Sequence, residues 1–351
     1  MWTELFIRNT PVSEACRGVL TCFQAFGLHA EVKAKDLAAI RCWFDSQNAQ
    51  QHMKNVFAMA GVRYAVMTNI PFDGEERGHW LSSRSHDAPE LLRSALRIDP
   101  LFAWDTACGV LHSAGFTADV DGARKHLDHC AQVMGPEYLM ASFNFSLKFP
   151  DEVPFSAGWL LEHVVAPVAR KLSLPFAIKC GTRRAANARL RQAGDGVGSF
   201  DVGVLNRLCT MFPDVKFLAT ILSMDNQHEL AVTARKFANL HVYGCWWFCN
   251  NPSLIHTLTA MRLEMLGSAF TAQHSDSRVL EHLVYKWAHS ACSSCSHPLC
   301  TLTCTYRPKS HRLRSNRPVF ENCSGWMASH SPRNRQECAS AARRQLRGVH
   351  V

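Results

Sequence analysis

"KFLATIL", residues 216–222, is a short apolar run that includes the β-branched residues Thr220 and Ile221. Six similar runs occur along the chain, and amphipathic helical stretches separate them. This alternation is expected of parallel βα units. The sequence therefore predicts an α/β fold with strands at 64–69, 94–99, 138–143, 175–180, 216–222, 240–245 and 268–273.

Seven βα units predict an incomplete TIM-like (β/α)8 barrel in which the first strand is missing. A parallel sheet without one strand would have two unpaired edges, which costs stability. Residues 2–20, "WTELFIRNTPVSEACRGVL", are polar and helical in pattern and precede the first predicted strand. We therefore expect the missing strand upstream of Met1. In a barrel of this kind the chemistry lies on the loops that follow the strands.

The positive charge of the chain is concentrated at its C-terminal end. The 351 residues carry a net charge of +9, and residues 291–351 hold ten basic and two acidic residues, or +8. Residues 1–290 are thus nearly neutral, so their function need not involve nucleic acid. We expect a partial barrel at 1–290 and a disordered, basic, Cys- and Arg-rich tail at 291–351.

Cysteine usage predicts a cytoplasmic protein. Nine of the fifteen cysteines are scattered singly before residue 291, as buried free thiols in a reducing compartment would be. No signal peptide pattern opens the chain, and no apolar run reaches the roughly 18 residues of a membrane span. In the tail, Cys295 and Cys300 are separated by four residues only, which is too close for the usual zinc pairs.

Charged residues follow two of the predicted strands. Arg97 and Asp99 in "LRIDP" form either a substrate contact or a surface ion pair before a turn. After the fourth predicted strand, a basic loop could hold an anionic substrate, although a solvated helix face is the alternative. Its basic residues are Lys179, Arg183, Arg184, Arg189 and Arg191.

Two further strand ends carry a histidine and two tryptophans. His228 in "SMDNQHEL" is a candidate acid or base, but Asp225 or Asn226 also fits a helix N-cap that would place His228 in a first turn. Trp246 and Trp247 could stack on a sugar ring or could pack in the core. If the segment is extended, one indole must point away from the core.

The last predicted strand is followed by Asp276 and Arg278, in "FTAQHSDSRVLEHL", residues 270–283. An aspartate at a barrel strand end is a candidate metal ligand, and the arginine could face a substrate carboxylate or developing negative charge. The alternative makes Ser275 or Asp276 the N-cap of the next helix, but a cap does not explain Arg278.

Several long segments closely resemble the uronate (glucuronate) isomerases, members of the amidohydrolase-like barrel superfamily. They are spread over about residues 4–290, and the resemblance implies a TIM-like barrel that converts D-glucuronate to D-fructuronate and D-galacturonate to D-tagaturonate in sugar-acid breakdown. The segments are "ELFIRNTPVSEACRGVLTC", "VMTNIPFD", "LRIDP", "NQHELAVTARKFANLHVYGCWWFCNNP" and "MRLEMLGSAFTAQHSDSRVLEHLVYKW".

The resemblance also implies roles for individual residues. Asp276 is similar to the metal-ligating aspartate of the family, Arg278 to the arginine paired with it, and Arg97 to an arginine used at the third barrel strand. The cofactor of the intact family is a divalent metal, expected to be zinc. The expected partner is a uronate sugar, and a second copy of the chain is a candidate partner; neither nucleic acid nor a membrane is expected. Arg184, Trp246 and Trp247 are the other substrate-binding candidates, and Asp276, Arg278 and His228 the catalytic ones.

The chain departs from the family in two respects. It contains no His-x-His pair, which the family uses as metal ligands on the first strand, and the likeness ends at about residue 290. Because one carboxylate cannot hold a catalytic metal, we expect little activity from this chain alone. The alternatives are a metal-dependent hydrolase of the amidohydrolase type and a truncated, non-catalytic remnant.

Overall fold

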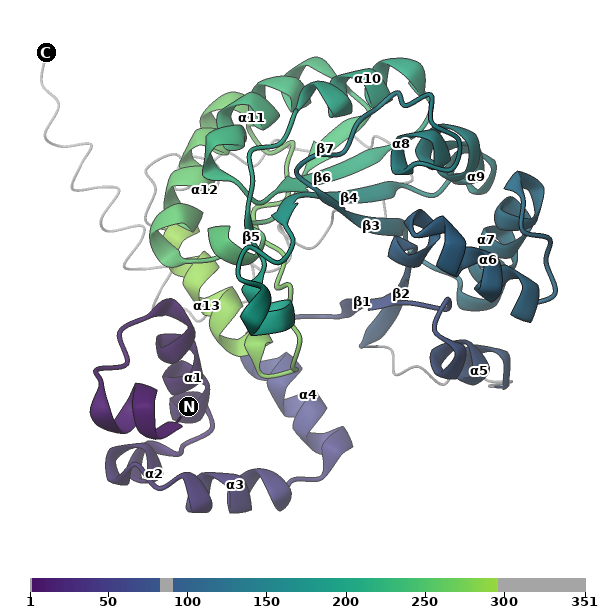
Figure 1. Cartoon of the computed structure of the whole chain (residues 1–351). Helices are drawn as coiled ribbons and strands as arrows, with labels where there is room; N and C mark the ends of the chain where they lie inside the picture. The colour runs from purple at the N-terminus through teal and green to yellow at the C-terminus, as the bar shows by residue number, and fades with distance from the viewer. Residues whose placement is uncertain (1, 83–90, 296–351) are drawn as a thin grey trace, which may run out of the picture. The chain divides into compact units, whose positions relative to one another are not determined.

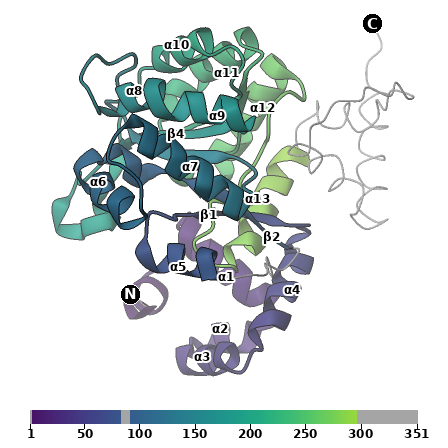
Figure 2. The same cartoon turned by 90° about the vertical axis from the view of Figure 1, so that its right-hand side faces the viewer.

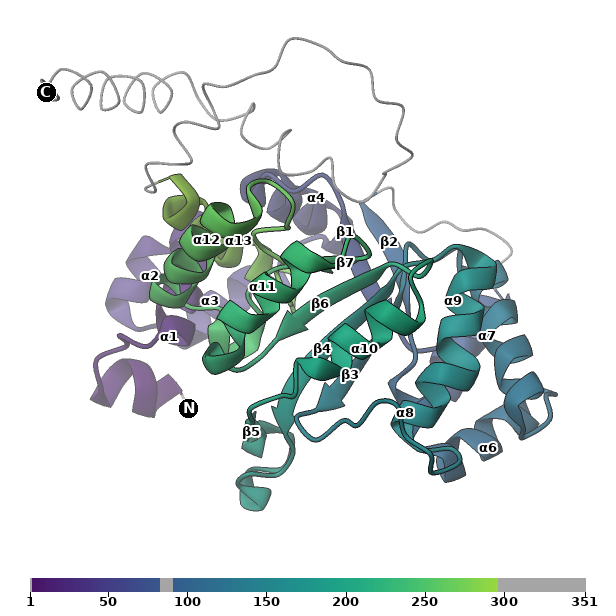
Figure 3. The ribbon, with the colours of Figure 1, turned by 90° about the horizontal axis from the view of Figure 1, so that it is seen from above.

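Six parallel strands follow one another in the same order along the chain and across the sheet. The computed structural model describes residues 2–82 and 91–295, and its sheet has the order β1-β2-β3-β4-β6-β7 (Figures 1 and 3). This is the order of a TIM-like α/β barrel, in which each strand pairs with the next. The strands are β1 (Ala65–Asn69), β2 (Leu92–Arg97), β3 (Leu139–Asn144), β4 (Phe176–Arg183), β6 (Phe217–Ile221) and β7 (Leu240–Val242).

The strands confirm six of the seven predicted runs and correct the last one. Residues 268–273 form no strand, and Thr271 alone makes an isolated bridge. A short apolar run occurs both in strands and in irregular segments, so the run alone does not show which of the two will form. The prediction of a strand at 268–273 is therefore wrong. The seventh strand of the sheet is instead β5 (Gly196–Val197), which pairs antiparallel with β4 through Thr182 and Arg183.

Helices follow each of the parallel strands β1 to β7. Figure 2 shows α7 and α9 lying over the face of the sheet near β4. Asp119 accepts a 2.7 Å hydrogen bond from the Gly122 N–H at the start of α7, and the left-handed Gly135 (φ +54°) ends it. The helices are α5 (Gly74–Ser82), α6 (Trp104–Ser113), α7 (Val120–Met134), α8 (Ala157–Leu160), α9 (Ala166–Leu172), α10 (Gly203–Met211), α11 (Gln227–Lys236) and α12 (Pro252–Leu266).

The chain divides into two compact units. Among the described residues, one unit comprises 64–82, 91–249 and 264–270 and contains the sheet. The other comprises 2–63, 250–263 and 271–295 and is mainly helical. The helical unit therefore combines the N-terminal and C-terminal segments of the described chain. Its other helices are α1 (Glu14–Ala25), α2 (His29–Ala34), α3 (Leu37–Asp45), α4 (Ala49–Ala60) and α13 (His282–Cys295).

Close packing in the helical unit joins segments that are far apart in sequence. A Cβ added at Gly18 of α1 would lie 2.7 Å from the Tyr285 ring of α13, so only glycine fits there. His52 Nε2 of α4 lies 2.8 Å from Glu281 Oε1, and the Cys22 thiol donates to the Glu281 carbonyl at 3.1 Å. These contacts hold α1, α4 and α13 together.

The predicted division at residue 290 stays a prediction. The last described helix, α13, runs to Cys295, and the remainder of the predicted tail lies outside the described residues. None of the helices described is long and apolar enough to span a membrane.

We predict that Asn226→Ala lowers the free energy of unfolding by about 2–4 kcal/mol, because it leaves two buried backbone groups unpaired. The Asn226 amide accepts from the Phe200 N–H and donates to the Phe200 carbonyl, both at 2.9 Å. Urea unfolding followed by circular dichroism would measure the loss. The control is Asn48→Ala, which removes an exposed cap of α4 and should cost about 1 kcal/mol; equal losses for the two variants would contradict the prediction.

Candidate functional site

A row of polar side chains crosses one face of the sheet on β3, β4 and β6. Ser142 pairs in register with Lys179, and Lys179 pairs with Thr220. Paired residues on neighbouring strands point to the same face, so the three side chains form one layer. Two residues earlier on each strand the same face carries an apolar layer of Met140, Ala177 and Leu218.

Arg97 and Asp99 form a bidentate ion pair at the end of β2. Arg97 Nε donates to Asp99 Oδ2 and Arg97 Nη2 to Asp99 Oδ1, both at 2.9 Å. Asp99 Oδ1 also accepts from the Ser142 N–H at 3.3 Å, which ties the pair to β3. Arg97 is in register with Met140, so it lies on the face that carries the polar row. The predicted ion pair is confirmed, and its side chains are only 29% and 23% exposed.

Lys179 is a buried cation on β4. Its residue is 8% exposed, and its Nζ lies 5.4 Å from the centroid of the Trp246 ring, which is itself buried. An ammonium group removed from water needs compensating contacts, and an indole face supplies part of them. Lys179 and Trp246 therefore form a paired cation and flat aromatic surface within the sheet-containing unit.

The two adjacent tryptophans have different environments. Trp246 is buried, whereas Trp247 is half-buried and stacks on Phe248 with ring centroids 4.6 Å apart. Trp247 has a φ of +43°, a conformation that is unusual for a bulky side chain. Such backbone strain is concentrated at functional sites, so the turn after β7 is a candidate for ligand contact.

Arg184 lies in the loop after β4 and is paired rather than buried. Its side chain is 55% exposed, and Nη1 lies 2.5 Å from Asp195 Oδ2. The Ala185 N–H donates to Asp195 Oδ1 at 2.9 Å. This hydrogen bond and the Arg184 guanidinium together lower the pKa of Asp195. The Arg184–Asp195 ion pair joins the two ends of the loop after β4. The role of Arg184 as a substrate contact stays a prediction.

His228 lies exposed in the first turn of α11. The predicted first-turn position is thus confirmed, and Asn226 occupies the N-cap position of α11 as predicted, although its side chain makes no capping hydrogen bond. Ser223 caps the preceding turn by accepting from the Asp225 N–H at 3.2 Å, and the Asn226 side chain bonds Phe200 instead.

Asp276 and Arg278 belong to the helical unit, whereas the other candidates belong to the unit that contains the sheet. Asp276 is half-buried with a φ of +45°, its carbonyl accepts from Lys286 Nζ at 3.2 Å, and Arg278 is exposed. The following helix, α13, begins at His282, so neither Ser275 nor Asp276 is its N-cap. The capping alternative is therefore wrong, and the left-handed aspartate is a second strained residue among the candidates.

The described residues do not provide a set of metal ligands. Within 2–82 and 91–295, no group of three or more His, Cys, Asp or Glu side chains is arranged to hold a metal ion. A structural or catalytic zinc needs three or four such ligands, and Asp276 supplies one. The donor set of the described chain thus does not fit the metal that the family resemblance implies.

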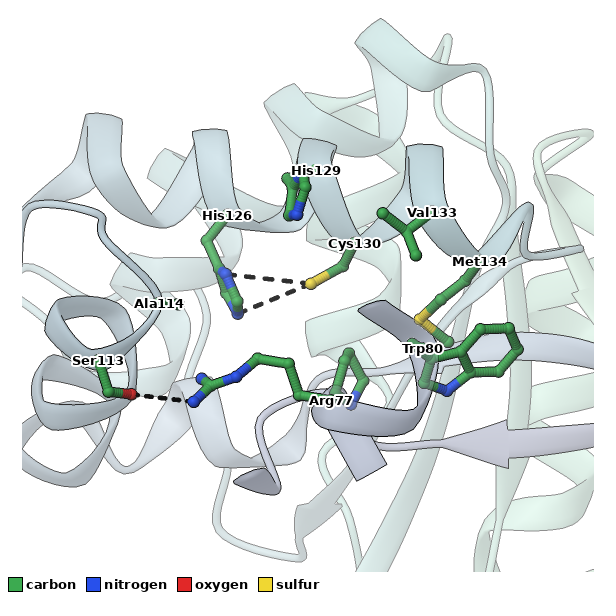
Figure 4. Close-up of a pocket in the computed structure, with 10 residues that line it drawn as sticks. Arg77, Trp80, Ser113, Ala114, His126, His129, Cys130, Val133 and Met134 are labelled. Carbon is green, nitrogen blue, oxygen red and sulfur yellow. Dashed lines mark hydrogen bonds between the residues drawn. The ribbon is translucent and has the colours of Figure 1, made fainter. Parts of the chain in front are cut away.

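A small cavity of about 150 Å³ lies between α5, α6 and α7 (Figure 4). His126 contacts the Cys130 thiol in its wall, and Arg77 donates to Ser113 Oγ at 3.1 Å. Burial lowers the pKa of His126 to about 4 and raises that of Cys130 to about 12. Both groups are neutral at pH 7, so they are not an activated thiolate and imidazolium.

The sequence did not single out Ser142, Thr220 or the burial of Lys179. The only signal was a polar residue within each apolar run, in "YLMASF", "PFAIKC" and "KFLATIL". Such residues align on one face only when the strand register is known. The structure therefore adds the polar row on the sheet to the candidate site residues that the sequence predicted in the loops after the strands.

Solved structures similar to this chain include one that resembles it in sequence as well. A uronate isomerase from Bacillus halodurans C-125 is 40% identical, with a TM-score of 0.79, over 83% of this chain and 70% of that one. A uronate isomerase from Thermotoga maritima (15% identity, TM-score 0.66, 83% and 73% coverage) and a glucuronate isomerase from Caulobacter crescentus (14%, 0.53, 68% and 59%) share the fold. No family model and no curated protein matches the chain.

We predict that His126 makes the protein less stable as the pH falls below about 6.5. The unfolded imidazole binds a proton near pH 6.5 whereas the folded one does so only near pH 4, so protonation favours unfolding between these values and has no effect above them. Arg77 and His129 add to the effect of burial. The loss between pH 7 and 4.5 should be about 2–3 kcal/mol.

The measurement is urea unfolding at both pH values for the unaltered chain and for His126→Leu. The variant should lose less stability on acidification by the stated amount. Equal losses of unfolding free energy in the two proteins would show that the pKa of His126 is the same in the folded and unfolded states.

Proposed function

Because this chain belongs to the uronate isomerase family, we propose that it interconverts aldose and ketose forms of uronic acids. Its substrates are D-glucuronate, converted to D-fructuronate, and D-galacturonate, converted to D-tagaturonate. The observation that carries the proposal is the 40% identity to a solved uronate isomerase over 83% of this chain. The polar row of Ser142, Lys179 and Thr220 beside the Arg97–Asp99 pair supports it, since a sugar acid needs both charged and hydroxyl contacts.

The reaction moves one proton from C2 to C1 and a second from the C2 hydroxyl to the C1 oxygen. A base removes the proton from C2 of the open-chain aldose, an enediolate forms, and the proton is delivered to C1 to give the ketose. Negative charge develops on the sugar oxygens, and fixed cations and hydrogen-bond donors lower its energy. The site must therefore supply a base, cations that hold the oxygens, and a surface for the sugar.

The candidate residues divide between these roles. In the sheet-containing unit, His228 is the candidate base and Arg97 holds developing negative charge. For the helical unit, the family resemblance implies the same two roles for Asp276 and Arg278. Asp99 keeps the Arg97 guanidinium fixed by two hydrogen bonds, so little reorganisation is needed when charge develops. Trp246, Trp247 and Arg184 line the path of the substrate. Since the described donors do not fit a metal, the proton transfer is assigned to side chains alone.

The setting of the reaction is the breakdown of sugar acids in the cytoplasm, in a protein that associates with itself. The nine cysteines before residue 291 are all free, and seven of them are buried and dispersed over both units. Such thiols persist in a reducing compartment.

We predict that the full chain catalyses slow isomerisation of D-glucuronate. In D2O the enediolate exchanges its proton with solvent, so the sugar should gain deuterium at the reacting carbon and ketose signals should appear by NMR. The rate should be low, because the described residues contain no group of three or more ligand side chains that could hold a catalytic metal. D-glucose, which lacks the carboxylate, is the matched control and should remain unchanged.

A hydrolase would behave differently in the same assay. Release of acid from a panel of amides and esters, with no deuterium gained by the uronates, would identify the alternative activity of the amidohydrolase type. Absence of both reactions after long incubation would favour the non-catalytic alternative.

We further predict that Arg97→Met reduces kcat/KM for D-glucuronate by roughly 10- to 100-fold, since a charge-assisted hydrogen bond contributes about 1.5–3 kcal/mol. The matched control is Arg93→Met on the same strand, where Arg93 pairs with Glu137 at 2.8 Å. This control should retain the activity of the unaltered chain. Equal activity of the two variants would show that Arg97 is not part of the active site.

A further inference from the structure

Lys179 places a positive charge inside the polar row of the sheet. This residue on β4 is almost entirely buried, with Ser142 of β3 and Thr220 of β6 beside it in register. Figure 3 shows the three strands as neighbours in the sheet. A buried ammonium group is costly unless an anion or strong acceptors compensate for the water it has lost. An apolar residue at this position would fill the same space at lower cost.

Thr220 provides a second, independent observation. It is 1% exposed, and within the described part of the chain its Oγ1 is buried without a hydrogen-bond partner. A buried hydroxyl of this kind destabilises the folded protein unless a ligand completes its hydrogen bonds. Because Thr220 is the register partner of Lys179, the unsatisfied hydroxyl and the buried cation face the same side of the sheet.

Trp246 completes the arrangement with a flat surface. Lys179 Nζ lies 5.4 Å from the centroid of its ring, so a molecule that contacts the ammonium also approaches the indole. A sugar acid combines the three features that this arrangement recognises: a carboxylate, neighbouring hydroxyl groups and an apolar face of C–H bonds.

We propose that Lys179 is the residue that binds the uronate carboxylate, and that the Thr220 hydroxyl hydrogen-bonds a sugar hydroxyl next to it. This inference rests on the proposed function and deepens it, because it assigns the discrimination between a uronate and a neutral sugar to one buried cation. Lys179 makes a positioning contact with the substrate in this proposal and carries no proton transfer.

The test is calorimetric titration of the full chain with D-glucuronate and with D-glucose. The unaltered chain should bind D-glucuronate roughly 10- to 100-fold more tightly than D-glucose, as expected for loss of one charged contact. Lys179→Met should remove this preference while leaving the weak affinity for D-glucose unchanged. The matched control is Lys171→Met, at an exposed lysine of α9 that pairs with Asp128 at 3.0 Å, and it should retain the full preference.

Thr220→Val keeps the test decisive if Lys179→Met does not fold. This variant preserves the shape of the side chain and removes the unsatisfied hydroxyl, so it should unfold at the same or a higher temperature. It should bind both sugars several-fold more weakly and keep the preference for the uronate. If Thr220 had a purely structural role, a substitution that preserves or raises the unfolding temperature would not weaken sugar binding.

The possible outcomes separate the two proposals. Normal binding by both Lys179→Met and Thr220→Val would overturn the inference and leave the proposed function intact. Equal weakening of both sugars by Lys179→Met would also overturn it, since that result indicates a packing role. If the unaltered chain binds neither sugar, the proposed function and the inference fail together.

Discussion

The parallel register of β3, β4 and β6 is the constraint on which the candidate site depends. A parallel ladder gives paired residues the same direction, so the register fixes Ser142, Lys179 and Thr220 on one face and the apolar layer beneath them. A shift of one residue along β4 would turn Lys179 to the opposite face and bring Ile178 or Cys180 in its place. The hydrophobic pattern of the strands therefore also sets the chemistry of the site.

Polar and apolar layers in the sheet have different energetic roles. The apolar layer stabilises the fold by burial, while the layer above it carries a buried cation and an unsatisfied hydroxyl, both of which reduce stability. Proteins tolerate such groups where a ligand uses them, because the free energy of binding offsets their cost. The bidentate Arg97–Asp99 pair adds two fixed charges beside this layer, each held by two hydrogen bonds.

Local pattern predicted the strands well and predicted the site less completely. Runs such as "KFLATIL" were identified because apolar and β-branched residues are bounded by polar ones, and β6 occupies most of that run. Residues 268–273 show the limit of this signal, since an equally apolar run forms an irregular segment. The alignment of Lys179 with Thr220 depends on pairing between strands that are about forty residues apart, which no local pattern contains.

The discontinuity of the helical unit determines the order in which the chain can fold. Gly18, Cys22 and His52 pack against Tyr285 and Glu281, which are synthesised more than two hundred residues later. During synthesis on the ribosome, the apolar surfaces of α1 and α4 that pack against α13 therefore stay exposed until the whole sheet has been translated. The N-terminal segment is thus a point of vulnerability to chaperone capture and proteolysis during translation, even if the finished protein protects it well.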